Sequence, residues 1–257
     1  MKKILFIVLA ILSSLNAESG MTDIYTGNGI NTSADSAVAN MLALRKTLTH
    51  KTRDDLKLNS DDEGKKYQFK HVYNPSYGYR DDILETYYQL KESGQVSRGY
   101  FASVFIFATW NLGYRGILKK YKAIVNTYKQ DSQIMYNAYI KSSFNKNNNV
   151  LLVSHSQGSL MANKLYGMLN STQKSKFSTV GVAPVANHIA GHKSSRGHYV
   201  TMYGDYGVFA VKGHLRPNTS GFGHGFVSSY LSQSKSRTKV SKYIKNAYDG
   251  FAKKAID

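Results

Sequence analysis

The fold of this chain is limited most strongly by an apolar run that stops abruptly at a short polar segment. The stretch NVLLVSHSQGSLMANKL, residues 149–165, passes from four consecutive apolar residues to Ser-His-Ser-Gln-Gly and then to an amphipathic sequence. Such a run is typical of a strand buried on both faces, and the periodicity after it predicts a helix from about residue 157 to 169. The chain therefore has a serine at a sharp junction between a buried strand and a helix.

The same succession of strand and helix recurs elsewhere in the sequence. TDIYTG, residues 22–27, predicts a strand that leads into Gly-Asn-Gly, and Thr32 or Ser33 is suited to cap the helix that follows. Further strands are predicted over residues 67–74, 177–182 and 198–205, and further helices over residues 80–93, 118–144 and 241–255. This alternation predicts an α/β fold with a mostly parallel sheet that helices cover on both faces.

The first seventeen residues, MKKILFIVLAILSSLNA, have the pattern of a secretory signal peptide. Two lysines precede an apolar stretch from Ile4 to Leu12, and small or polar residues extend to Ala17. Cleavage after Ala17 would leave residues 18–257 as one exported domain, either periplasmic or secreted. The sequence contains no cysteine, which excludes disulfides and thiol chemistry, so the stability of this domain has to come from packing.

The chain is strongly basic, with a formal net charge of +18, or +16 once the two lysines of the signal peptide are subtracted. Such a charge favours anionic partners. In an exported protein these are an anionic membrane surface or lipopolysaccharide, and no known motif for nucleic-acid binding is present. A basic but otherwise unremarkable surface is the alternative. The C-terminal helix is both basic and amphipathic, and it could either lie on a membrane or pack on the sheet.

The serine segment resembles the Gly-x-Ser-x-Gly nucleophile elbow of the α/β-hydrolase superfamily, and most closely that of its lipase and esterase members. Ser154 occupies the first glycine position and Gly158 the second. Small residues are needed there because the strand and helix backbones pass close on either side of Ser156. The resemblance implies an α/β-hydrolase-like fold in which Ser156 is the nucleophile, whereas the alternative is a serine in an ordinary loop.

In this superfamily the acid and then the base follow the serine along the chain, where they orient and activate it. After Ser156 the sequence has no glutamate and three aspartates, and only Asp205 is followed by a histidine. The resemblance therefore implies that Asp205 is the acid, although an aspartate in Gly-Asp-Tyr-Gly can also be a turn residue.

Two histidines, His214 and His224, follow Asp205. His224 lies in the glycine-rich segment SGFGHGF, which could fold back over the sheet, whereas His214 is flanked by basic residues and is interpreted as a solvated loop residue. We therefore expect His224 to be the base. His155, next to the serine, is interpreted as a packing or substrate-facing residue.

An acyl-transfer site also needs two donors for the oxyanion of the tetrahedral intermediate. The resemblance implies that the Gln157 backbone amide is one of them and that the loop after an earlier strand supplies the other. In YTGNGINTS the pair Asn28-Gly29 stands where lipases often have His-Gly, so the second donor would be the Ile30 amide, with the Asn31 amide as its rival.

These features predict an exported serine hydrolase that cleaves carboxylic esters, including lipids, through a Ser-Asp-His triad. The alternative is a non-catalytic basic envelope protein that binds anionic lipid or polysaccharide. No cofactor is expected, and no metal, because His188 and His192 have the spacing of ligands but no accompanying glutamate. The aromatic residues between 96 and 145, before the nucleophile strand, form an insertion that is either core or a lid over an acyl pocket.

Overall fold

A computed structural model describes residues 21–49, 67–191 and 197–254, so the expected signal peptide and His192 lie outside the described residues. Within these ranges five strands form one sheet in the order β2-β1-β3-β4-β5, and each neighbouring pair runs parallel. The strands are β1 (Thr22–Gly27), β2 (Tyr67–Val72), β3 (Asn149–His155), β4 (Phe177–Val182) and β5 (His198–Val200). The predicted α/β class and parallel sheet are confirmed.

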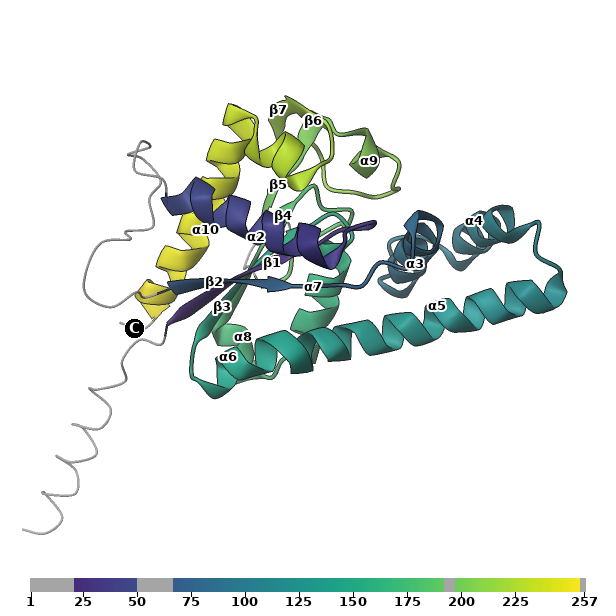
Figure 1. The fold of residues 1–257 in the computed structure, drawn as a ribbon, viewed down its shortest axis with the longest axis horizontal. Helices are drawn as coiled ribbons and strands as arrows, with labels where there is room; N and C mark the ends of the chain where they lie inside the picture. Colours follow the sequence, from purple (N-terminus) through teal and green to yellow (C-terminus); the bar gives the residue numbers. More distant parts are fainter. Residues whose placement is uncertain (1–20, 50–66, 192–196, 255–257) are drawn as a thin grey trace, which may run out of the picture.

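Helices cover both faces of this sheet (Figure 1). Because side chains alternate along a strand, Ile24 packs into one core with α2 (Ala34–Thr49) and α10 (Ser234–Lys254). Its neighbour Tyr25 packs into a second core with α6 (Lys141–Asn145) and α7 (Gly158–Met168) on the opposite face. A short helix, α8 (Ser171–Ser175), then leads into β4.

The C-terminal helix α10 packs on the sheet, which is one of the two interpretations of its sequence. Its apolar side chains enter the core beside β3 and β4, and they are Val240, Ile244, Ala247 and Phe251. The helix begins at Ser234, seven residues earlier than predicted. Among the described residues, the structure contains no helix with the length and apolar character needed to cross a membrane.

The chain between β2 and β3 is largely helical and extends away from the sheet (Figure 1). It forms α3 (Tyr79–Glu92), α4 (Arg98–Thr109) and α5 (Tyr114–Met135), then a π-helical turn (Tyr136–Ile140) that leads into α6. The three long helices share a small core of their own, made by Leu84, Tyr88, Phe101, Phe105 and Ile124. Part of the aromatic segment is therefore core, whereas Phe107, Trp110 and Tyr114 are exposed.

The segment predicted as one strand over residues 198–205 is in fact two strands that belong to different sheets. β5 ends at Val200, and β6 (Met202–Gly204) pairs with β7 (Thr219–Phe222) in a separate two-stranded sheet. The break lies at Thr201, whose carbonyl accepts from the Asn218 amide and whose own amide donates to the Asn218 side chain. These bonds to Asn218 divert the backbone from the main sheet toward α9 (Tyr206–Phe209).

Candidate active site

The junction between β3 and α7 holds Ser156 in a backbone conformation that few residues other than glycine adopt. Its φ is +53°, in the left-handed region. Hydrogen bonds on both sides of Ser156 stabilise this strained conformation. The Ser156 amide donates to the Val182 carbonyl at 3.0 Å, and the Ser156 carbonyl accepts from the Ser159 amide and hydroxyl. The serine is thus fixed at the carboxyl end of the central strand, in the sharp turn that its sequence predicted.

Two glycines make room for this turn. A Cβ atom on Gly158 would lie 2.8 Å from the Asn28 carbonyl oxygen, because the start of α7 passes directly against the loop after β1. A Cβ atom on Gly29, in that loop, would lie 2.8 Å from the Cβ atom of Ser156. The loop with Asn28 and Gly29 therefore lies immediately beside the serine.

This packing gives a first test, in which two glycines of the same helix are replaced by alanine. Gly158→Ala should lower the free energy of unfolding by about 1–3 kcal/mol, because the new methyl group displaces the Asn28 backbone. Gly167→Ala has no atom within 4 Å of the new methyl group and should be neutral or stabilising by up to about 1 kcal/mol. Urea unfolding measures both, and equal effects of the two variants would contradict the close approach of α7 to this loop.

Three polar side chains form one hydrogen-bonded chain at this edge of the sheet. His224 Nε2 lies 2.9 Å from Ser156 Oγ, and His224 Nδ1 lies 2.8 Å and 3.0 Å from the two carboxylate oxygens of Asp205. The structure thus brings together the serine, the histidine and the acid that the sequence singled out. His214 is not part of this chain, because its Nδ1 bonds to the Val211 carbonyl instead.

Asp205 is fully buried and keeps its charge through the donors around it. Burial raises the pKa of this carboxyl, but hydrogen bonds from His224, Tyr230 and the Val208 amide outweigh burial and lower the pKa below its ordinary value. The Tyr230 hydroxyl donates to Oδ2 at 2.7 Å, and the Val208 amide donates to Oδ1 at 3.1 Å. Asp205 therefore caps α9, as a turn residue would, and also holds His224.

His155 supports the loop that carries His224. Its Nε2 lies 2.7 Å from the His224 carbonyl oxygen, which can only accept, so Nε2 carries the proton. Burial, followed by the nearby His224 ring, lowers the pKa of His155 to about 3, so this imidazole is neutral at physiological pH. Of the two interpretations of His155, the structure favours packing over contact with substrate.

The two backbone amides expected to bind an oxyanion are free of other acceptors. Among the described residues, the amides of Gln157 and Ile30 donate to no carbonyl or side chain. The Asn31 amide, the rival of Ile30, instead donates to the Asp82 carboxylate at 2.7 Å. Gln157 also precedes the first turn of α7, where the helix dipole favours negative charge. Within the described residues, neither amide is therefore taken up by another acceptor, as an oxyanion site requires.

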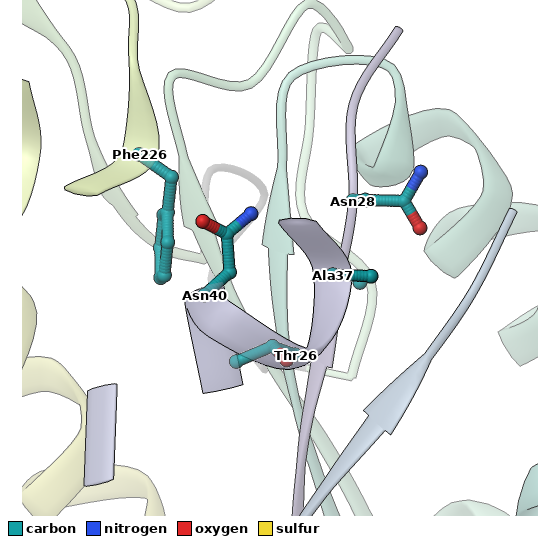
Figure 2. Close-up of a pocket in the computed structure, with 6 residues that line it drawn as sticks. Thr26, Asn28, Ala37, Asn40 and Phe226 are labelled. Carbon is teal, nitrogen blue, oxygen red and sulfur yellow. The ribbon is translucent and has the colours of Figure 1, made fainter. Parts of the chain in front are cut away.

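The loop that carries Ile30 is anchored through the Asn28 side chain, which donates to the Asn74 carbonyl and accepts from the Asn74 amide. A narrow hollow lies between the end of β1, α2 and Phe226. Figure 2 shows Asn40 and Phe226 on one side of it, while the Asn28 amide group points away from them. The hollow has essentially no room even for a water molecule, so it does not accommodate a substrate group.

Acidic side chains of α3 lie behind this loop, and sequence reasoning did not single them out. Asp82 is buried and accepts from the Asn31 and Tyr77 amides and the Ser76 hydroxyl. Glu85 lines a second hollow, of about 90 Å³, between α3 and α5. Burial, followed by the charges of Asp131 and Asp82, raises the pKa of Glu85 to about 8, so this carboxyl is largely protonated at neutral pH.

The raised pKa of Glu85 makes stability depend on pH. Between about pH 4.5 and pH 8 the unfolded chain ionises Glu85 while the folded chain keeps it protonated, so this residue destabilises the fold increasingly as pH rises. Glu85→Gln should therefore raise the free energy of unfolding by roughly 2–4 kcal/mol at pH 8 and change it little near pH 4. Glu92→Gln, at an exposed position of the same helix, should change it by less than about 1 kcal/mol at either pH. A Glu85→Gln effect that did not vary with pH would be incompatible with a protonated Glu85.

Among the residues that the structure describes, no three His, Cys, Asp or Glu side chains gather closely enough to hold a metal ion. Comparisons with known proteins add no assignment: no family model, no curated protein and no solved structure matches the chain.

Proposed function

We propose that the protein is an exported serine hydrolase of α/β-hydrolase type, which cleaves carboxylic esters through an acyl-enzyme intermediate. The observation that carries the proposal is the hydrogen-bonded chain from Ser156 through His224 to the buried Asp205. A serine hydroxyl becomes a good nucleophile when a base takes its proton, and these distances suit that transfer.

In the proposed reaction, Ser156 Oγ attacks the ester carbonyl carbon while His224 Nε2 takes the hydroxyl proton. The Asp205 carboxylate stabilises the imidazolium that forms, and the amides of Gln157 and Ile30 bind the oxyanion. His224 then gives the proton to the leaving alcohol, which departs as the acyl-enzyme forms. Water, deprotonated by the same imidazole, then attacks the acyl carbonyl carbon. The bond to Ser156 Oγ breaks, the imidazolium returns the proton to Oγ, and the carboxylic acid leaves.

The arrangement of the chain supports the α/β-hydrolase comparison. The serine follows the central strand of a parallel sheet and precedes a helix, and the acid and the histidine come later in the chain, each after a β-strand. Ser154, which replaces a glycine of the superfamily pattern, is fully buried at the end of β3. The positive φ of Ser156 is a further support, because strained backbone of this kind gathers at functional sites.

A non-catalytic basic protein on the same scaffold is the alternative, and an ester-hydrolysis assay separates the two. Residues 18–257 should release p-nitrophenol from p-nitrophenyl acetate, butyrate or octanoate, with an initial burst close to one equivalent of enzyme if loss of the acyl group is slow. No added metal or cofactor should be needed. Folded protein that turns over none of these esters, yet binds anionic lipid or polysaccharide, would favour the alternative.

A further inference from the structure

Large apolar side chains are exposed at the end of the α4–α5 hairpin. Four of them lie within nine residues, and their exposed fractions are 59% for Ile106, 81% for Phe107, 77% for Trp110 and 76% for Tyr114. We call these four residues the hairpin tip. They belong to the end of α4 and the start of α5, in the part of the chain that extends away from the sheet (Figure 1). Exposed apolar residues gathered in this way mark interaction sites more often than isolated ones do.

The hairpin does not need these four side chains for its own packing. Phe101 and Phe105, on the other face of α4, are buried against Leu84, Tyr88 and Ile124 and make the contacts between the helices. α4 is therefore apolar on two faces, and one of them packs against the neighbouring helices. The second face has no partner among the described residues.

Basic residues flank the hairpin tip in the sequence. Residues 93–130 contain no aspartate or glutamate but six basic residues, which are Arg98, Arg115, Lys119, Lys120, Lys122 and Lys129. Lys120 pairs with Asp81 at 2.7 Å, whereas Arg98, Arg115, Lys119 and Lys122 are exposed. An anionic bilayer offers both an apolar layer and a negatively charged surface, and tryptophan and tyrosine favour the boundary between them.

The first turn of α3 joins the hairpin tip to the candidate active site. Arg80 donates to Asn111, in the turn between α4 and α5, at 3.2 Å. Two residues later, Asp82 accepts from the Asn31 amide in the loop beside Ser156. These two contacts link the turn beside the hairpin tip to the loop beside Ser156.

We propose that the hairpin tip inserts into the surface of a bilayer that contains anionic lipids and holds the active site at that surface. In this proposal Phe107 and Trp110 enter the interface, while Arg115, Lys119 and Lys122 contact lipid phosphates. The inference rests on the proposed function in one respect: it names lipid esters as the substrates of that hydrolase. Binding itself does not require Ser156.

The chain carries its own probe, because Trp110 is its only tryptophan. The Ser156→Ala variant of residues 18–257 is titrated with vesicles of phosphatidylglycerol and phosphatidylcholine, so that no lipid is consumed. Trp110 emission should shift to shorter wavelength, and lipids brominated in their acyl chains should quench it. Raising salt from 0.1 to 0.5 M should weaken binding several-fold, since screening shortens the reach of exposed charges. Pure phosphatidylcholine should bind far more weakly.

Variants that retain Trp110 test whether the hairpin tip is responsible for vesicle binding. Phe107→Ser should weaken vesicle binding about tenfold or more, and Lys119→Ser with Lys122→Ser should weaken it about tenfold at low salt. Leu42→Ser, at an exposed apolar position of α2, is the matched control and should bind like the parent. With Ser156 intact, all three variants should hydrolyse a short soluble ester at the wild-type rate.

Two outcomes overturn the proposal. Trp110 emission that is unaffected by saturating anionic vesicles would remove lipid as the partner of the tip. A shift that appears without lipid as protein concentration rises, together with a dimer in sedimentation, would identify a second copy of the chain as the partner. Vesicle binding by a wild-type protein that cleaves no ester would instead leave the docking intact and refute only the proposed function.

Discussion

Replacing Ser156 with alanine is expected to lower kcat for p-nitrophenyl butyrate by about 10⁴- to 10⁶-fold, because the reaction loses its nucleophile. The oxyanion amides and the binding surface remain, so KM should change little. Steady-state hydrolysis, with circular dichroism to show that the variant is folded, measures the effect.

Ser154→Ala is the matched control for this variant. Ser154 lies two residues earlier, in β3, and its buried hydroxyl has no hydrogen-bond partner among the described residues. Removing an unpaired hydroxyl should be neutral or slightly stabilising and should leave kcat within about threefold of wild type. A Ser156→Ala variant that kept more than about 1% of wild-type kcat, after contaminating esterase had been excluded, would assign the nucleophile to another residue.

Replacing Asp205 with asparagine should lower kcat by about 10³- to 10⁴-fold while leaving the fold in place. The Val208 amide and the Tyr230 hydroxyl donate to different oxygens of Asp205, so the single asparagine oxygen keeps only one of these bonds, and the side chain cannot stabilise the His224 imidazolium. It also favours the wrong tautomer of the imidazole, since its amide group can donate to Nδ1. The measurement is kcat, paired with urea unfolding to follow the capping role separately.

Tyr230→Phe tests the hydrogen bond to Asp205 separately from the negative charge of Asp205. It keeps the carboxylate but removes the hydroxyl that donates to Asp205 and accepts from the Met202 amide. We expect a loss of about 1–3 kcal/mol in the free energy of unfolding, because buried groups lose their partner, and a loss in kcat near tenfold. If Asp205→Asn reduced kcat no more than Tyr230→Phe does, Asp205 would be only the cap of α9.

The sequence could identify the serine turn because its signals are local. An apolar strand, small residues at 154 and 158 and an amphipathic helix follow one another within about twenty residues. The choice of His224 over His214 also rested on local composition, namely the glycines around it. The hydrogen bonds of both histidines agree with that choice.

Contacts between distant segments could not be predicted in this way. The Asp82 carboxylate accepts from the Asn31 amide, which lies 51 residues away in the sequence and was the alternative to the Ile30 amide as an oxyanion donor. The Tyr230 hydroxyl donates to Asp205 across 25 residues. No periodicity relates the members of these pairs. The helix α4 was missed for another reason: apolar residues lie on both of its faces, which conceals the helical period.

The central claim is that Ser156 is an activated nucleophile, and covalent labelling tests it most directly. Folded residues 18–257 are treated with a fluorophosphonate, digested and analysed by mass spectrometry. We expect one adduct per chain, located on Ser156, no adduct in Ser156→Ala and much slower labelling in His224→Ala. An adduct on a different residue, or a folded wild-type protein that stays unlabelled, would contradict the account.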